Sequence, residues 1–128
     1  MEIALIIAIA LHALSGVFWA GTTFALARAP AAGAEKLRRP QLGAAVVAIL
    51  SGAVLGHLAH RGAFGGAERV LAAGAGAALL AAVIQAATLG AAASVQGHGE
   101  ARRTIAQRIA AGLLAVTVLC MVLARYAG

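Results

Sequence analysis

Three histidines lie inside or at the edge of long apolar segments, where an ionisable side chain is costly. His12 lies about 13 Å inside the first segment, and His57 and His60 lie near the end of the second. Each is therefore a candidate for a functional site. A neutral imidazole in such surroundings either forms a hydrogen bond with a neighbouring helix or ligates a metal. For His12, the hydrogen-bonding alternative offers Gln85 and Thr88 as partners.

Small, polar and aromatic residues recur along the first apolar segment at three- and four-residue spacing. This stripe consists of His12, Ser15, Gly16, Trp19 and Thr23. Residues at this spacing share one face of an α-helix. The rest of the segment is mainly Ile, Leu, Ala and Phe, so we expect the stripe to face the inside of the protein.

Two histidines from adjacent antiparallel helices can bind one haem iron from opposite sides. We predict His12 as one axial ligand and His57 as the second, with His60 as its substitute and Trp19 near the porphyrin. His57 lies only about 3–5 Å inside the edge of its segment, so helix tilt must reduce its difference in depth from His12. A copper site that uses His57, His60 and either Met1 or another soft ligand is the competing metal hypothesis.

Four apolar segments must position these residues. Their predicted helical ranges are about 3–27, 41–60, 68–93 and 103–126. At 1.5 Å per residue, each is long enough to cross a hydrocarbon core of about 30 Å. The connections are short, so consecutive helices should be antiparallel neighbours. The predicted fold is all-α: a single-domain, integral membrane, four-helix up-down bundle.

The composition supports a chain covered by lipid. Hydrophobic residues make up 62% of the 128 residues and charged residues only 11%, whereas soluble domains carry about 25% charged residues. The chain has no Asp, and its four Glu residues lie at segment ends or in the connections. The absence of a carboxylate within the spans argues against a proton-coupled exporter and against a carboxylate-bridged dimetal site.

The ten basic residues are shared unequally between the two sides of the predicted membrane span. One side holds seven of them: Arg28, Lys36, Arg38, Arg39, Arg102, Arg103 and Arg108. Because cytoplasmic loops carry the excess of positive charge, this side should face the cytoplasm and both termini should lie outside. The bacterial inner membrane is the predicted location. Basic groups placed between apolar segments also argue against nucleic-acid binding.

Residues 11–21 read Leu-His-Ala-Leu-Ser-Gly-Val-Phe-Trp-Ala-Gly. This segment resembles the opening of the CopD-like copper-resistance proteins and the HemJ-type protoporphyrinogen oxidases. His12, Trp19 and Gly21 match their shared pattern of a first-helix His, a Trp seven residues later, and then Gly. The resemblance implies a small helical bundle that binds b-type haem through His12.

The sequence therefore predicts a haem b-binding membrane protein in electron transfer or haem-linked redox chemistry. The alternatives are a protoporphyrinogen-oxidase-like enzyme that passes electrons to quinone, a copper-handling membrane protein, and a cofactor-free structural subunit of a larger membrane complex. The small side chains also predict a homo-oligomer, with Gly52 and Gly56 as the contact face because small residues let helices approach closely.

Overall fold

The computed structural model describes residues 2–29, 34–59, 65–90 and 99–127. These form four α-helices: α1 (Glu2–Arg28), α2 (Ala34–Ala59), α3 (Gly66–Gly90) and α4 (Gly99–Ala124). Each is long and apolar enough to cross a membrane. The all-α prediction is confirmed, since the described part of the chain contains helices and no strand.

Two helices begin four or more residues earlier than the hydropathy pattern predicts. α2 starts at Ala34 instead of 41, and α4 starts at Gly99 instead of 103. Apolar content marks only the part of a helix that lipid covers, and charged turns extend both helices beyond it. Pro40 lies within α2. A proline removes one backbone hydrogen bond from a helix interior, and here the helix continues through it.

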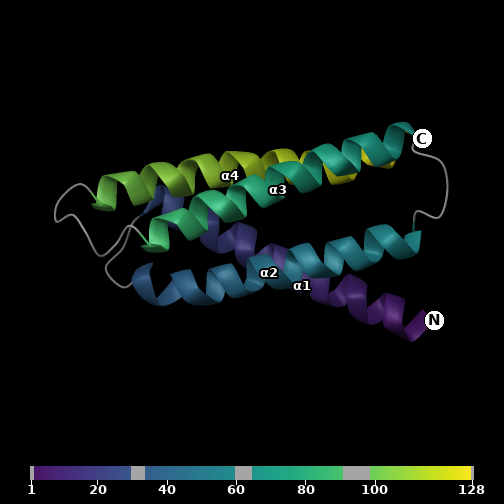
Figure 1. Ribbon diagram of the computed structural model, residues 1–128, viewed down its shortest axis with the longest axis horizontal. Coiled ribbons are helices and arrows are strands. Elements are labelled where there is room, and N and C mark those ends of the chain that lie inside the picture. Colours follow the sequence, from purple (N-terminus) through teal and green to yellow (C-terminus); the bar gives the residue numbers. More distant parts are fainter. Residues whose placement is uncertain (1, 30–33, 60–64, 91–98, 128) are drawn as a thin grey trace.

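The four helices lie as two pairs, α1 with α2 and α3 with α4 (Figure 1). The two termini lie at the same end of the molecule (Figure 1). Glycine brings α3 and α4 close together, because a Cβ atom at Gly74 would lie only 2.8 Å from the Cβ of Cys120. The Thr117 hydroxyl donates a hydrogen bond of 3.0 Å to the Gly74 carbonyl across the same contact. Gly74 therefore serves helix packing.

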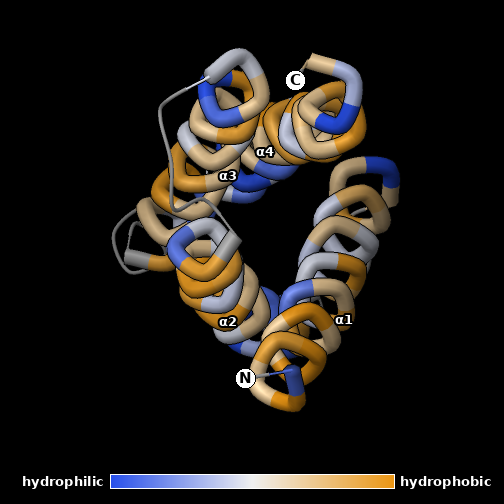
Figure 2. The backbone as a smooth tube through the Cα atoms, turned by 90° about the vertical axis from the view of Figure 1, so that its right-hand side faces the viewer, coloured by the Kyte–Doolittle hydropathy of each residue, from blue (hydrophilic) through white to orange (hydrophobic). Residues whose placement is uncertain are grey.

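The interior is built mostly from alanine, with Trp19 as its one aromatic side chain among the described residues. The central cluster contains Trp19, Ala45, Ala48, Ala78, Ala81, Ala110 and Leu114. The large aliphatic residues lie outside instead: Ile3, Leu14 and Val17 are each more than 70% exposed. Apolar residues recur along the length of all four helices (Figure 2). Water would not tolerate such a continuous apolar surface, whereas lipid would.

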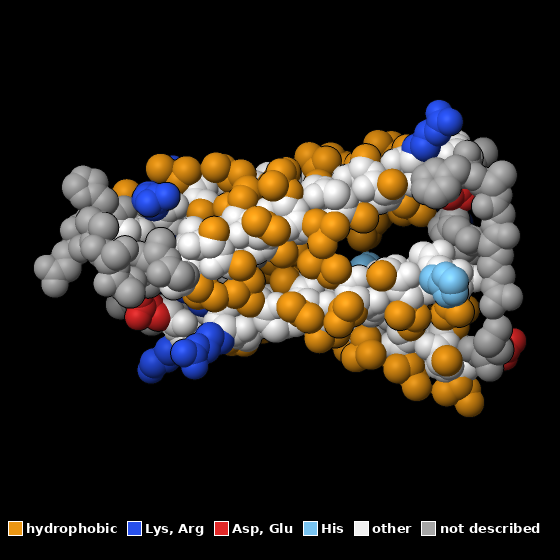
Figure 3. All heavy atoms as spheres, viewed as in Figure 1, with side chains coloured by type: hydrophobic (Ala, Val, Ile, Leu, Met, Phe, Trp, Pro, Cys, Tyr) orange, Lys and Arg blue, Asp and Glu red, His pale blue; other side chains and the backbone are white. Residues whose placement is uncertain are grey.

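The two helix pairs diverge toward the end that carries the termini, and the space-filling view shows a hollow between them there (Figure 3). Burial follows the same trend along α1. In the part of α1 before Trp19, Ala8 is the only described residue that is buried. In the part after Trp19, three residues are buried: Thr23, Leu26 and Ala27. Side chains on the inner face of the first half of α1 therefore border the hollow.

Candidate functional site

The predicted stripe on α1 does face the inside of the protein. Trp19 and Thr23 are buried, and His12, Ser15 and Gly16 are half-buried, while most neighbouring residues are exposed. His12 lies against α2, where its Nδ1 is 2.8 Å from the carbonyl oxygen of Ala48. The predicted alternative partners, Gln85 and Thr88, are not the ones that this imidazole uses.

The hydrogen bond of His12 defines its tautomer. A carbonyl oxygen can only accept, so Nδ1 must carry the proton and donate to Ala48. Nε2 is then left with its lone pair, and among the described residues it has no hydrogen-bond partner. Histidines that ligate metals are typically held in this way, with one ring nitrogen donating to a backbone carbonyl and the other left for the metal.

Gly52 provides the space that the imidazole occupies. A Cβ atom at this position would lie 2.9 Å from Cε1 of His12 and 3.2 Å from its Nδ1. The hydroxyl of Ser51 lies 3.4 Å from the same Nδ1 and also donates to the Ala48 carbonyl at 3.2 Å. Gly52 therefore has a contact within the chain, while its predicted role between copies of the chain stays a prediction.

Substituting Gly52 with alanine should displace the His12 imidazole and break its bond to Ala48. Because the atom in the way is the end of a side chain, the helices can stay packed. Loss of such a supporting interaction typically lowers the affinity of a metal site about 10–100-fold, and we expect that loss in haemin titrations of the variant. Gly43→Ala on the same helix is the matched control, since its Cβ would meet open space. Equal titration curves for the two variants would contradict this role of Gly52.

The structure does not bring His57 to His12. His57 is exposed on α2, and it lies about 7.5 Å along the axis from Gly52 and about half a turn around the helix from Ala48. Since Ala48 and Gly52 face His12, His57 points to another side. His60 lies outside the described residues. His12 is thus the one predicted ligand that the described residues place on the inside of the protein.

The second part of the site is a buried network of uncharged polar side chains that joins all four helices. Its members are Trp19 and Thr23 on α1, Gln41 on α2, Gln85 on α3 and Gln107 on α4. All five side chains are buried, at 8% exposure or less. Trp19, predicted to lie near a porphyrin, is a member of this network.

Gln85 is the central residue of this network. Its Oε1 accepts from Nε1 of Trp19 at 2.7 Å, and its Nε2 donates to Thr23 at 2.9 Å and to Gln107 at 3.0 Å. Gln41 completes the network, donating to Thr23 at 2.8 Å and accepting from Gln107 at 3.2 Å. A satisfied network of this kind fixes how helices pack in an apolar environment. It sets the positions of the helices around the hollow.

Sequence reasoning did not single out Gln41 or Gln107. The search for costly residues in the apolar segments considered ionisable groups, and glutamine carries no charge. The available signal was the occurrence of Gln41, Gln85 and Gln107 within or at the start of apolar runs. Each needs hydrogen-bond partners there, and they find those partners in one another.

The structure describes only part of the predicted copper site. No group of three His, Cys, Asp or Glu side chains that could hold a metal ion occurs among residues 2–29, 34–59, 65–90 and 99–127. Cys120 packs against Gly74. Two of the predicted copper ligands, Met1 and His60, lie outside the described residues.

Comparison of the chain with protein-family models, curated proteins and solved structures found no match. The resemblance of residues 11–21 to the CopD-like and HemJ-type proteins therefore stays a prediction.

Proposed function

We propose that the protein is a haem b-binding integral membrane protein that acts in electron transfer or haem-linked redox chemistry. Its helices would form an up-down bundle in the bacterial inner membrane. The observation that carries the proposal is the 2.8 Å hydrogen bond from Nδ1 of His12 to Ala48, which leaves Nε2 as a ligand for iron. An imidazole held in this way suits a metal centre.

The residues around His12 are consistent with this ligand. Gly52 adds no side chain beside the imidazole, and the hollow between the helix pairs lies in the same half of α1 (Figure 3). Apolar helices rich in Ala and Gly suit a flat, apolar macrocycle. A bound haem b would supply one-electron chemistry, while the protein would hold the iron at Nε2 and keep the site apolar.

The proposed orientation follows from the charges. The basic residues at the starts of α2 and α4 would face the cytoplasm, and both termini would lie outside. His12 would then lie about 15 Å from the outer end of α1, close to the middle of the membrane. A redox group at that depth is accessible to lipid-soluble electron carriers, so quinone is the class of partner that we propose.

The purified protein should show the absorption spectrum of a haem protein. We expect a Soret band in mild detergent, either as isolated or after haemin is added, and a shift on reduction. Sharp α and β bands in the reduced spectrum would indicate a second axial ligand, for which His60 is the candidate that the sequence offers. A colourless protein that haemin does not change would contradict the proposal.

The same purified protein can also distinguish haem binding from the three alternative functions. Copper without porphyrin in metal analysis would favour a copper-handling protein, and stable co-purifying proteins without colour would favour a structural subunit. Complementation of a haem-synthesis defect would identify a protoporphyrinogen-oxidase-like enzyme. The mass of the particle would report whether the protein is a homo-oligomer.

A further inference from the structure

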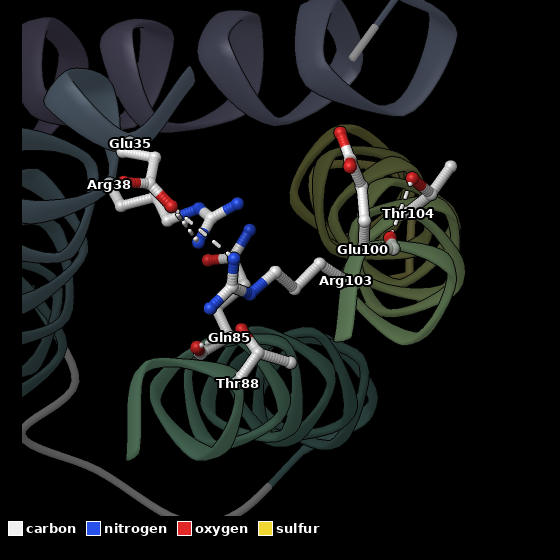
Figure 4. A network of polar contacts seen from close by, with 7 residues as sticks. All are labelled: Glu35, Arg38, Gln85, Thr88, Glu100, Arg103 and Thr104. Carbon is white, nitrogen blue, oxygen red and sulfur yellow. Dashed lines mark hydrogen bonds and ion pairs between the residues drawn. The ribbon is translucent and has the colours of Figure 1, made fainter. Parts of the chain in front are cut away.

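Two arginines converge on one carboxylate at the end of the bundle opposite the termini. Nη1 of Arg103 lies 3.3 Å from Oε1 of Glu35, and Nη1 of Arg38 lies 3.9 Å from the same oxygen. Arg38 comes from α2 and Arg103 from α4, and both guanidinium groups point into the space between these helices and α3 (Figure 4).

The side chains of the two arginines are largely buried, whereas the carboxylate of Glu35 that they share is exposed. The side chains of Arg38 and Arg103 are 16% and 18% exposed, but that of Glu35 is 76% exposed. A covered charge is costly unless it is paired, and one mostly solvated carboxylate cannot neutralise two guanidinium groups. The second acid at this end, Glu100, forms no ion pair with either arginine among the described residues, although its charge acts on Arg38 at longer range.

The uncharged polar side chains near the arginines already form hydrogen bonds with other groups. Gln85 belongs to the buried network, and the Thr88 hydroxyl donates to the carbonyl of Gln85 at 2.7 Å. By contrast, Arg108 has a structural role, since its Nε donates to the carbonyl of Ala27 at the end of α1 at 3.3 Å. Within the described chain, no such bond to a helix end engages Arg38 or Arg103.

The surroundings of the pair add further positive charge. α2 and α4 both begin at this end, and helix N-termini carry partial positive charge. Lys36, Arg39 and Arg102 lie next to the pair in sequence and are exposed. The pair thus has an excess of hydrogen-bond donors and of positive charge, which is the requirement for binding an anion.

We propose that Arg38 and Arg103 together bind the phosphate of an anionic phospholipid. Two guanidinium groups can offer a phosphate several parallel N–H donors. Lipid is favoured over free phosphate because exposed apolar residues lie at the same level of both helices: Leu37, next to Arg38 in sequence, is 40% exposed, and Ile105, two residues after Arg103, is 56% exposed. Acyl chains can lie along such residues while the headgroup reaches the arginines between the helices. This inference does not depend on haem binding.

The test is a titration of the full-length, delipidated protein with phosphatidylglycerol, followed by native mass spectrometry. Arg38→Gln/Arg103→Gln should weaken binding by roughly tenfold or more, because charge-assisted hydrogen bonds are lost. Arg39→Gln/Arg102→Gln is the matched control, since it removes the same charge from exposed neighbours and should bind as the wild type does. Phosphatidylcholine and inorganic phosphate are titrated in parallel.

A third variant tests the proposal without removing a donor. Glu35→Gln should bind phosphatidylglycerol more tightly, because the competing carboxylate is gone. Equal losses in the two double variants would overturn the proposal, as would unchanged binding in Arg38→Gln/Arg103→Gln. If that variant does not fold, unchanged or weaker binding by Glu35→Gln would overturn it. Equal binding of phosphatidylcholine, or of inorganic phosphate, would overturn the assignment to an anionic lipid.

Discussion

Replacing Gln85 with leucine is expected to destabilise the folded protein by about 1–3 kcal/mol, the usual result of leaving buried polar groups without partners. Trp19, Thr23 and Gln107 would each lose the bond that Gln85 makes with them. Hydrogen bonds between membrane helices average about 0.6 kcal/mol each, so the loss of three gives a similar figure.

Unfolding of the Gln85→Leu variant is measured by SDS titration in mixed micelles. Trp19 is the only tryptophan in the chain, so its fluorescence reports directly on the network. Thr88→Val is the control, because the hydroxyl of Thr88 bonds only to a carbonyl of its own helix among the described residues. We expect the control to stay within about 0.5 kcal/mol of the wild type. A Gln85→Leu protein as stable as the wild type would show that the network does not hold the helices together.

Replacing His12 with alanine is expected to abolish the Soret band of the isolated protein and to weaken haemin binding more than about 100-fold. Loss of a supporting partner alone costs about 10–100-fold in metal affinity, and loss of the ligand should cost more. No other described histidine faces the inside of the protein to replace it. Haemin titration of the purified variant, followed by absorbance, measures the effect.

His57→Ala is the matched control for this experiment. It removes an imidazole from an exposed position on α2, and we expect it to retain the haemin affinity of the wild type. If His57→Ala loses haem and His12→Ala keeps it, the assignment of the ligand is reversed. Equal retention by both variants would mean that neither imidazole binds the iron.

The number and type of helices could be predicted because each apolar segment is long and uninterrupted. The inward stripe on α1 could also be predicted, since its spacing defines one face of a helix. The starts of α2 and α4 could not, because Lys36, Arg38 and Arg102 extend the helices beyond the apolar part. Hydropathy does not distinguish a charged helical turn from a loop.

The partners of individual side chains could not be predicted from the sequence. The sequence offers Gln85 and Thr88 as alternative partners for His12, but Gln85 bonds to Trp19, about two turns further along the same face of α1. His12 instead bonds to a backbone carbonyl of Ala48, an acceptor that every residue carries and no sequence pattern marks. Gly52 is beside His12 because the axial offset of α1 and α2 places it there.

Imidazole rescue of His12→Gly tests most directly whether Nε2 of His12 binds the haem iron. The glycine variant leaves space for free imidazole beside Gly52, where the side chain of His12 lies in the wild type. Iron ligation by His12 predicts that the variant binds haemin poorly and that added imidazole restores the wild-type Soret band. Wild-type binding without imidazole, or a loss that imidazole does not restore in a protein that elutes as the wild type does, would contradict it.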